Sequence, residues 1–423
     1  MKSSVLRRID ELMPELTVLF DQVARDSSDG KGVTRDAFGP RETQAAKILA
    51  TFANKMGFET TYDCGGNLHV ARAGHVNDPP KIIVASHLDS VPVGGNYDGL
   101  AGVIAGIATL RVLEDKGPAS ENLRVIGFRG EESPWFGQAY LGSKLLLGEL
   151  SHADLQTLRR FDTGRTLGEH LQQLGMKLPD GKLQPLIPLN SLKAYFELHI
   201  EQAPLLEHLG LPVGIATAIR GNIRHPYATC LGEYAHSGAV PRHLRHDAVM
   251  ATAKVLSFAD EYWRQLINAG HDDVVFTCGI FQTDSAEHTM TKVPGQVTFS
   301  TNIGSISNQV MEEMEAAITR RAAELAVEHG VEFDWGKRVG TPAVNLDTSI
   351  MRLANTIGQE IGIEPHQMPT VGHDAALFQR RGFPTAVVLI RNANGSHNPS
   401  EHMDMNDFAL GASLMASIIS AMI

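Results

Sequence analysis

Six acidic and histidine residues carry side chains that could bind metal ions or move protons. They are His87, Asp98, Glu131, Glu132, His199 and His397. Three apolar runs, residues 82–84, 125–128 and 194–198, come shortly before five of these six residues. Short apolar runs predict buried strands, and strand ends hold ligands in a defined geometry. The pattern therefore predicts that loops at strand ends bring these side chains into one site.

The residue types indicate which metal ions such a site would bind. Imidazole and carboxylate ligands suit Zn²⁺, Mn²⁺, Co²⁺ or Ni²⁺, and the absence of thiolate ligands leaves the choice among them open. Two such ions about 3.5–4 Å apart, bridged by one carboxylate and one water, form a common hydrolytic centre. We expect Asp98 to be the bridge. His87 and His199 would complete one ion, and Glu132 and His397 the other.

Two further carboxylates are expected to support these ligands. Glu131 cannot readily bind the same ion as Glu132 if the two point to opposite sides of the chain. Glu131 can instead take a proton from the bridging water and pass it to a leaving nitrogen, which suits a carboxylate in a dry site. Asp89, two residues after His87, is expected to hold the far nitrogen of that imidazole.

Each of these features taken alone has an ordinary structural explanation. The chain has 18 histidines, and a pair of adjacent glutamates is common on protein surfaces. The glycines near position 95 could suggest a phosphate-binding loop, but neither GK[ST] nor GxGxxG is present, so nucleotide binding is not expected. The metal site is favoured by the joint occurrence of HxD, an Asp eleven residues after the His, EE after an apolar run, and HNP in a late loop.

The elements that must position these residues indicate an α/β fold with two domains. The length of 423 residues exceeds the roughly 250–300 that one core usually supports. Strand-like runs alternate with helical ones to about residue 211, which predicts a mixed sheet flanked by helices. The pattern changes over residues 212–330, where two helices accompany several strands. We therefore expect a catalytic domain of residues 1–211 and 331–423, interrupted by a smaller α/β lid domain.

Composition narrows the partners and the compartment. The chain has 37 basic and 48 acidic residues, a net charge of −11, and no long run of Lys or Arg, so nucleic acid is not an expected partner. Three widely spaced cysteines favour a reducing compartment, and the charged amino terminus is unlike a secretion signal. The uncharged segment of residues 408–423 is too short for a membrane span. We expect a cytoplasmic protein without a membrane partner.

Several segments resemble the aminoacylase and carboxypeptidase G metallohydrolase superfamily. They are ASHLDSVPVGGNYDGLAGV, FRGEESPWFGQAYLGS, ELHIEQAPLLE, AHSGAVPRHLRHDA, VGHDAALF and GSHNPSEHM. HIEQ and SHNPSE are similar to the amidohydrolase branch, which includes N-carbamoyl-L-amino-acid hydrolase, allantoate amidohydrolase and β-alanine synthase. The resemblance extends from about residue 63 to residue 404.

The resemblance implies a catalytic domain interrupted by a lid domain through which two subunits pair as a homodimer. It also implies two divalent metal ions held by the five ligands named above, with Glu131 as the base. Gln202 of HIEQ would contact the substrate. His236 of the AHSG segment would polarise the scissile carbonyl, often from the partner subunit.

Some positions depart from the family pattern, and these departures concern the substrate. Relatives usually hold a substrate carboxylate with an Asn and an Arg of the lid, where this chain has Thr291 and Gly304. Trp135 stands where relatives often carry Arg. Arg391 stands where relatives commonly have an uncharged residue, and it is either a relocated carboxylate anchor or an ordinary loop residue. An unmodified N-carbamoyl amino acid is therefore not the expected best substrate.

The sequence predicts a metal-dependent amidohydrolase that cleaves a C–N bond in an amide, carbamoyl or ureido group of a small molecule. The alternatives within the same superfamily are a dipeptidase or aminoacylase, and a hydrolytic deaminase of a small amine. An inactive binding or scaffold protein would be expected to lose at least one of the six residues, and none is lost. The residues leave open the substrate, the native metal, the number of ions bound and the oligomeric state.

Overall fold

The chain divides into two compact units. The computed structural model describes residues 4–120, 122–178 and 183–423. The first unit contains Met1–Thr217 and Leu346–Ile423, and the second contains Ala218–Asn345. These boundaries differ from the predicted ones at 211/212 and 330/331 because the short strands near them pair across long sequence distances. Hydrophobic periodicity does not reveal such pairing.

The first unit contains most of the helices and eight strands of a nine-stranded sheet, whose ninth strand, β15 (Val344–Asn345), is the last element of the second unit. Its elements before the second unit are α1 (Ser4–Ser27), α2 (Pro40–Lys55), β1 (Phe58–Tyr62), β2 (Leu68–Arg72), β3 (Ile82–His87), α3 (Leu100–Val112), η1 (Glu114–Ser120), β4 (Leu123–Phe128), α4 (Ser133–Phe136), α5 (Leu141–Leu147), α6 (His152–Thr157), α7 (Leu167–Gln173), β5 (Ala194–Ile200), α8 (Leu205–Leu209) and β6 (Val213–Ile219). Its elements after the second unit are α11 (Thr348–Ile361), β16 (His366–Thr370), α12 (Ala375–Arg380), β17 (Thr385–Ile390), β18 (Asn392–Ala393), β19 (His402–Met403) and α13 (Met405–Met422). Helices and strands alternate in the sequence, as expected for a sheet covered on its faces.

The sheet of the first unit is mixed, as predicted. Its strand order is β1-β2-β4-β3-β5-β17-β6-β15, with β16 paired to β6. The four central strands β4, β3, β5 and β17 are parallel to one another, whereas β2 and β6 join them as antiparallel neighbours. Every residue of these four strands is buried, as is usual for parallel strands covered on both faces. The carboxyl ends of all four strands therefore meet at one edge of the sheet.

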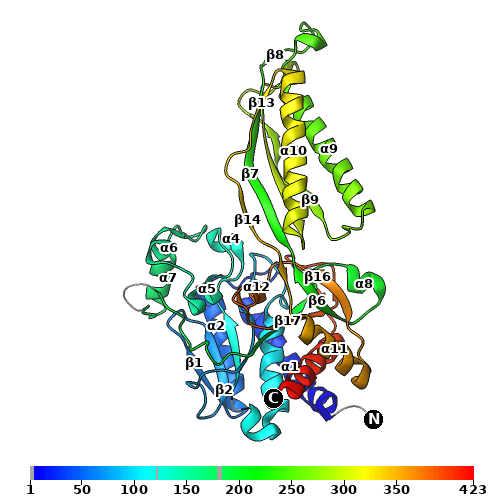
Figure 1. The fold of residues 1–423 in the computed structure, drawn as a ribbon. Helices are drawn as coiled ribbons and strands as arrows, with labels where there is room; N and C mark the ends of the chain where they lie inside the picture. Colours follow the sequence, from blue (N-terminus) through cyan, green and yellow to red (C-terminus); the bar gives the residue numbers. More distant parts are fainter. Residues whose placement is uncertain (1–3, 121, 179–182) are drawn as a thin grey trace. The chain divides into compact units, whose positions relative to one another are not determined.

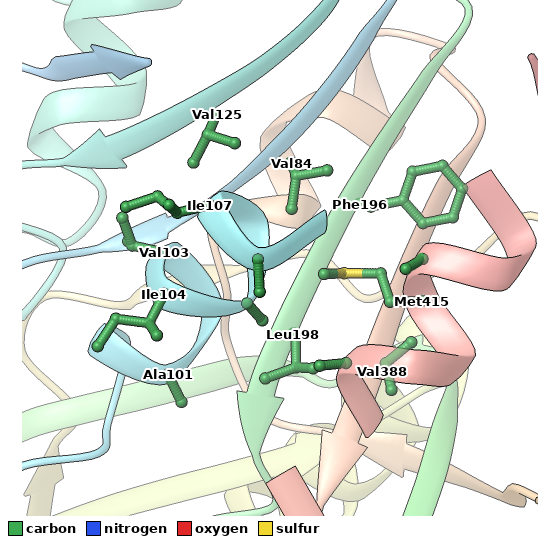
Figure 2. Packing of buried hydrophobic residues seen from close by; sticks show 14 of the residues in the cluster. Val84, Ala101, Val103, Ile104, Ile107, Val125, Phe196, Leu198, Val388 and Met415 are labelled. Atoms are coloured by element: carbon green, nitrogen blue, oxygen red, sulfur yellow. The ribbon is translucent and has the colours of Figure 1, made fainter. Parts of the chain in front are cut away.

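Two apolar helices pack on this sheet and form the main core. Figure 2 shows Val103, Ile104 and Ile107 of α3 near Val84 of β3 and Val125 of β4. Phe196, Leu198 and Val388 of β5 and β17 lie near Met415 of α13 in the same view. Among the described residues α13 is the one helix long and apolar enough to cross a membrane, yet 67% of it is buried inside the fold. It is a core helix that contacts α1, α3, α11 and β17.

The second unit is a sheet with two long helices. Its elements are β7 (Gly221–Leu231), β8 (Ala235–His236), η2 (Arg242–Leu244), α9 (Ala248–Asn268), β9 (Val275–Thr277), β10 (Phe281–Thr283), β11 (Lys292–Val293), β12 (Gln296–Ser305), α10 (Asn308–His329), β13 (Glu332–Asp334), β14 (Val339–Thr341) and β15 (Val344–Asn345). The strand order is β10-β12-β7-β13, with β14 on β7 and β9 on β12. Helices α9 and α10 lie side by side in Figure 1 and share an apolar core with β7 and β12. β8 and β11 form a separate two-stranded ribbon.

Candidate metal centre

The six predicted residues lie at the carboxyl ends of the parallel strands or in the loops that follow them. His87 is the last residue of β3, and Asp98 ends the loop that follows it. Glu131 and Glu132 follow β4, His199 lies near the end of β5, and the His397 loop follows β17. Open α/β sheets bind ligands outside the carboxyl ends of their strands. The sheet order thus explains how residues more than 300 positions apart come together.

The first group of ligand atoms contains His87, His199 and Asp98, as predicted for one ion. Nε2 of His87 and Nε2 of His199 each lie 3.2 Å from Oδ1 of Asp98. The two Nε2 atoms are 3.4 Å apart. All three residues are at most 3% exposed, so the group lies in a dry environment.

The second group contains Asp98, Glu132 and His397, as predicted for the other ion. Nε2 of His397 lies 3.3 Å from Oε1 of Glu132 and 3.5 Å from Oδ2 of Asp98. Glu132 is 5% exposed, whereas the His397 side chain is 50% exposed. Asp98 therefore presents one oxygen to each group, which is the position expected of a bridging ligand.

The hydrogen bonds of the two buried histidines show that this group fits a cation. Nδ1 of His87 lies 3.1 Å from the main-chain oxygen of Asp89, and Nδ1 of His199 lies 2.9 Å from that of Ile200. A carbonyl oxygen can only accept, so both Nδ1 atoms donate and each neutral ring keeps its lone pair on Nε2. Two lone pairs and the Oδ1 of Asp98, which has no hydrogen-bond partner among the described residues, then converge. A bound cation satisfies all three.

The Glu131 carboxylate lies beside this group. One of its oxygens is within 4.8 Å of ligand atoms of both His87 and Glu132, so it does not point to the opposite side of the chain. Among the described residues no group donates a hydrogen bond to this carboxylate. Burial raises the pKa of Glu131 well above its usual value, while the charge of His87 opposes the rise and Glu132 adds to it. A carboxylate of this kind can accept and release a proton.

Asp89 supports the site differently from the prediction. Its main-chain oxygen is the acceptor for Nδ1 of His87, and its carboxylate Oδ1 lies 3.4 Å from the same nitrogen. The two carboxylate oxygens accept the main-chain N–H groups of Glu131 and Glu132 at 2.9 and 3.0 Å. Asp89 therefore ties the loop after β3 to the loop after β4.

Two polar side chains contact the bridging carboxylate from outside the ligand set. Nε2 of Gln202 donates to Oδ2 of Asp98 at 2.7 Å, and Oγ of Ser396 donates to the same oxygen at 2.6 Å. Oε1 of Gln202 is buried and has no hydrogen-bond partner among the described residues. Gln202 and His397 both adopt a positive φ, 65° and 60°, which is uncommon for residues other than glycine and occurs often at functional sites. Gln202, predicted to contact the substrate, is thus placed at the metal centre.

A buried polar network beneath the ligands was not predicted. Glu197 accepts hydrogen bonds from Ser86, Tyr195 and the main chain of Ala375, and its carboxylate lies near His199 and His373. Asp374 accepts a hydrogen bond from Ser143, and its second oxygen has no partner among the described residues. The VGHDAALF segment, which contains His373 and Asp374, was the sequence feature that could have indicated this network. It is far from the ligands in the sequence, so its proximity to them could not be predicted.

Burial governs the ionisation of this network. Burial raises the pKa of Asp374 to about 8, and the neighbouring Glu197 carboxylate adds to the rise. Burial also raises the pKa of Glu197, against the charge of His199. Asp374 therefore keeps its proton at neutral pH, because a second charge beside Glu197 would be costly in a dry interior.

His236 lies in the second unit, on the ribbon of β8 and β11, and is exposed. Its Nδ1 accepts a hydrogen bond of 3.1 Å from the main-chain N–H of Gly238. An N–H group can only donate, so the neutral ring carries its proton on Nε2. His236 thus presents a hydrogen-bond donor, the form that its predicted role with a carbonyl requires.

Arg391 is paired with a carboxylate of its own chain. Its Nε and Nη2 atoms donate to the two carboxylate oxygens of Asp407 at 2.7 and 3.2 Å. Asp407 is in the first turn of α13 and is buried. The guanidinium therefore joins the residue after β17 to α13, while 33% of the Arg391 side chain is exposed.

Two of the other three departures from the family pattern, Gly304 and Trp135, are explained by packing. A Cβ at Gly304 would lie 2.8 Å from Cγ2 of Val275 on the neighbouring strand. Any side chain larger than that of glycine would therefore require Val275 or the main chain to shift. Trp135 is 3% exposed, and its indole N–H donates to the main-chain oxygen of Ser90. Thr291 accepts the main-chain N–H of Ser237 through its own main-chain oxygen. None of these positions offers a positive charge to a substrate.

Comparison with known proteins agrees with this geometry. A family model described as peptidase family M20/M25/M40 matches residues 83–421. An N-carbamoyl-L-amino acid amidohydrolase of Geobacillus stearothermophilus is 30% identical over 390 residues, which cover 91% of this chain and 92% of the relative. An allantoate amidohydrolase of Escherichia coli (strain K12) is 26% identical over 392 residues, which cover 92% of each.

A solved structure shows the same fold. The crystal structure of a hydantoinase/carbamoylase family amidase from Burkholderia multivorans has a TM-score of 0.84 and 27% sequence identity, with 97% of both chains covered. The family model includes all six residues of the metal centre and most of both units. The chain therefore belongs to peptidase family M20/M25/M40.

Proposed function

We propose that this protein hydrolyses a C–N bond in an amide, carbamoyl or ureido group of a small molecule, with two divalent ions held by the metal centre. The observation that carries the proposal is the position of Asp98, whose two oxygens face two separate groups of ligand atoms. His87 and His199 would hold one ion, and Glu132 and His397 the other. The donor atoms are compatible with Zn²⁺, Mn²⁺, Co²⁺ or Ni²⁺.

The residues of the chain divide the work as follows. The ions, when bound, would polarise the scissile carbonyl and make a water easier to deprotonate. Glu131 takes the proton from the attacking water, because its carboxylate lies beside the ligands and has no hydrogen-bond donor of its own among the described residues. It then passes the proton to the leaving nitrogen. His236, which carries its proton on Nε2, would donate to the carbonyl oxygen.

The substrate is proposed to lack a carboxylate at the place where relatives bind one. Val275 occupies the space that a side chain at position 304 would need, and Arg391 is paired with Asp407. The named relatives act on N-carbamoyl-L-amino acids and allantoate, which supports a carbamoyl or ureido group as the part that is cleaved. Recognition of the rest of the molecule would then rest on contacts other than a salt bridge.

The test is a comparison of substrates on metal-loaded enzyme. Protein stripped with a chelator and reloaded with Mn²⁺ or Zn²⁺ is assayed on carbamoyl, ureido and acyl-amino compounds, each as a free acid and as the matching carboxamide. Ammonia release is measured for the carbamoyl and ureido compounds, and release of the free amine for the acyl-amino compounds. We expect turnover that requires metal, with kcat/KM for the carboxamide at least equal to that for the acid. Turnover without metal would contradict the metal centre, and a strong preference for the acid would contradict the proposed substrate.

We also infer a cytoplasmic homodimer that pairs through the second unit. The family resemblance supports this pairing, and large apolar side chains are exposed in the second unit, among them Tyr227 at 74%, Val327 at 87% and Met290 at 97%. All three cysteines are free, which suits a reducing compartment. Light scattering after size-exclusion chromatography tests the dimer, and a monomer at micromolar concentration would contradict it.

A further inference from the structure

A buried arginine holds the loop that carries two of the metal ligands. Arg35 is 0% exposed and lies between α1 and α2 in the sequence, more than 50 residues before His87. Its Nε donates to the main-chain oxygen of Leu88 at 2.6 Å. Its Nη2 donates to the main-chain oxygen of Asp98 at 3.2 Å. One guanidinium thus joins the first and last residues of the loop between His87 and Gly99.

The middle of the loop is bound to the same residue. Nη1 of Arg35 donates to Oδ1 of Asn96 at 3.2 Å, and the Asn96 amide in turn donates to the main-chain oxygen of Phe20 on α1. The main-chain N–H of Arg35 donates to Oγ of Ser90, and the main-chain N–H of Ser90 donates to the oxygen of Arg35. Arg35 therefore holds residues 88 and 90 at the start of this irregular segment and residues 96 and 98 at its end.

Arg35 is unusual because its charge has no ion pair within 4 Å among the described residues. Fully buried arginines are nearly always paired, since an uncompensated buried charge is costly. Here the acidic groups Glu401, Asp89 and Asp98 stabilise the charge of Arg35 by longer-range electrostatic attraction, without a direct ion pair. Retention of such a charge calls for a role that an apolar residue cannot perform, and the acceptors of Arg35 indicate what that role is.

The peptide of the bridging ligand is held from both sides. Its carbonyl oxygen accepts from Arg35, and the N–H of Asp98 donates to Oε1 of Glu401 at 3.2 Å. The same Glu401 oxygen accepts the N–H of Tyr97 at 2.8 Å. Opposite charges at the two ends of one residue fix its main chain, and with it the direction in which the Asp98 carboxylate points.

We propose that Arg35 is a positioning residue that sets the metal affinity of the site by ordering the loop of residues 88–98 before metal binds. The inference rests on the proposed function, because it requires that His87 and Asp98 bind metal. A metal site needs its ligands held within about 0.5 Å of the binding geometry. A loop ordered in advance does not lose conformational entropy when the ion arrives, so the affinity is higher.

The test measures metal binding directly, on full-length protein stripped with a chelator. Mn²⁺ and Zn²⁺ dissociation constants are determined by chelator competition for the wild type, Arg35→Met and Arg35→Lys. We expect Arg35→Met to weaken binding by about 10- to 100-fold, the usual range for residues that orient metal ligands. Arg35→Lys keeps the charge, but its compact ammonium lacks the planar fork that spans the three separate acceptors, so we expect it to weaken binding by several-fold.

The matched control is Arg124→Met. Arg124 is also buried, at 4% exposed, and donates to two main-chain oxygens, those of His75 and Asp78, in a loop that carries no metal ligand. A purely structural role for buried arginines predicts equal losses of affinity in the two Met variants, whereas the positioning role predicts wild-type affinity for Arg124→Met. Thermal unfolding of each metal-free variant shows whether the fold is retained.

The outcomes are separable. Wild-type affinity in Arg35→Lys would overturn the proposal even if Arg35→Met fails to fold, because it would show that the hydrogen-bonding fork is not needed. An equal loss in Arg124→Met would overturn it as well. A wild-type protein that binds neither metal would instead refute the metal centre, and with it the proposed function.

Discussion

Glu131 and Glu132 are neighbours in the chain but have different surroundings. Glu132 is buried and faces the exposed imidazole of His397 at 3.3 Å. Glu131 is partly exposed and accepts no hydrogen bond from the described residues. The main-chain N–H groups of both residues donate to the carboxylate of Asp89. Asp89 therefore fixes the main chain from which both glutamate side chains extend. Glu132 can therefore serve as a metal ligand and Glu131 as a base, although the two residues are adjacent in the chain.

Replacement of Glu131 by Gln should abolish turnover and leave metal binding intact. The amide keeps the shape of the side chain but cannot accept the proton of the attacking water, which costs about 10²- to 10⁴-fold in kcat. Metal content by atomic emission spectroscopy, measured with kcat, checks this. His397→Ala is the comparison, because it should lose metal from the second group. A Glu131→Gln enzyme with normal kcat would remove Glu131 from the mechanism.

Arg391→Ala should lower stability and leave KM unchanged. The substitution removes the fork that holds the buried Asp407 carboxylate at the start of α13, and an unsatisfied buried carboxylate costs about 1–3 kcal/mol. Thermal unfolding measures the loss, and KM is compared for an acidic substrate and its neutral analogue. An increase in KM for the acid alone would show that Arg391 contacts substrate after all.

At the scale of elements, the site depends on how β3 is joined to α3. Gly99 ends the loop with a φ of 67°, and a Cβ there would lie 2.5 Å from ring atoms of His87. The glycine is therefore needed twice, for the left-handed conformation and for the close approach of the imidazole. Helix α3 begins at Leu100 and is buried almost throughout, so neither it nor the histidine can move aside freely.

Gly99→Ala should weaken metal binding more than a matched glycine substitution. The control is Gly57→Ala, because Gly57 has a φ of 91° and nothing within 4 Å of its Cβ position. Both variants carry backbone strain of roughly 1–3 kcal/mol, but only Gly99→Ala displaces a metal ligand. Dissociation constants for Mn²⁺ and unfolding temperatures distinguish the two effects. Equal metal affinities in the two variants would mean that the close contact with His87 is tolerated.

At the scale of the whole molecule, all five predicted ligands come from the first unit. Metal binding should therefore stabilise that unit, since a ligand bound only to the native state adds to the free energy of unfolding. Without metal, the same unit contains several buried carboxyl groups close to one another. Their protonation then governs its stability.

The metal-free protein should lose stability as pH rises from about 4 to about 8, partly because of Asp374. Its folded-state pKa is about 8, above the ordinary value of 3.8, so in this window the native state binds more protons than the unfolded state. One such group lowers the free energy of unfolding by roughly 1 kcal/mol per pH unit. Asp374→Asn should flatten the dependence, as measured by urea unfolding at pH 5.5, 7 and 8.5. An unchanged slope would exclude Asp374 as its source.

Local sequence was enough to predict the strands and the ligand types. The apolar runs 82–84, 125–128 and 194–198 predict strands, and they lie within β3, β4 and β5. The reason is that a parallel strand covered on both faces must be apolar throughout, which is a local property. The chemistry of His, Asp and Glu is likewise a property of the residue, so the kind of site was predictable before its geometry.

Only the tertiary structure decided which groups support the site and which residues are excluded from it. Arg35, Glu401 and Asp374 contact segments that are far away in the sequence. Local sequence patterns do not predict such contacts. Arg391 appeared available until its pairing with Asp407 was seen. Residue type and local periodicity thus determined the fold class and the candidate ligands, whereas long-range hydrogen bonding and burial, which depend on the assembled chain, decided how each polar group is placed.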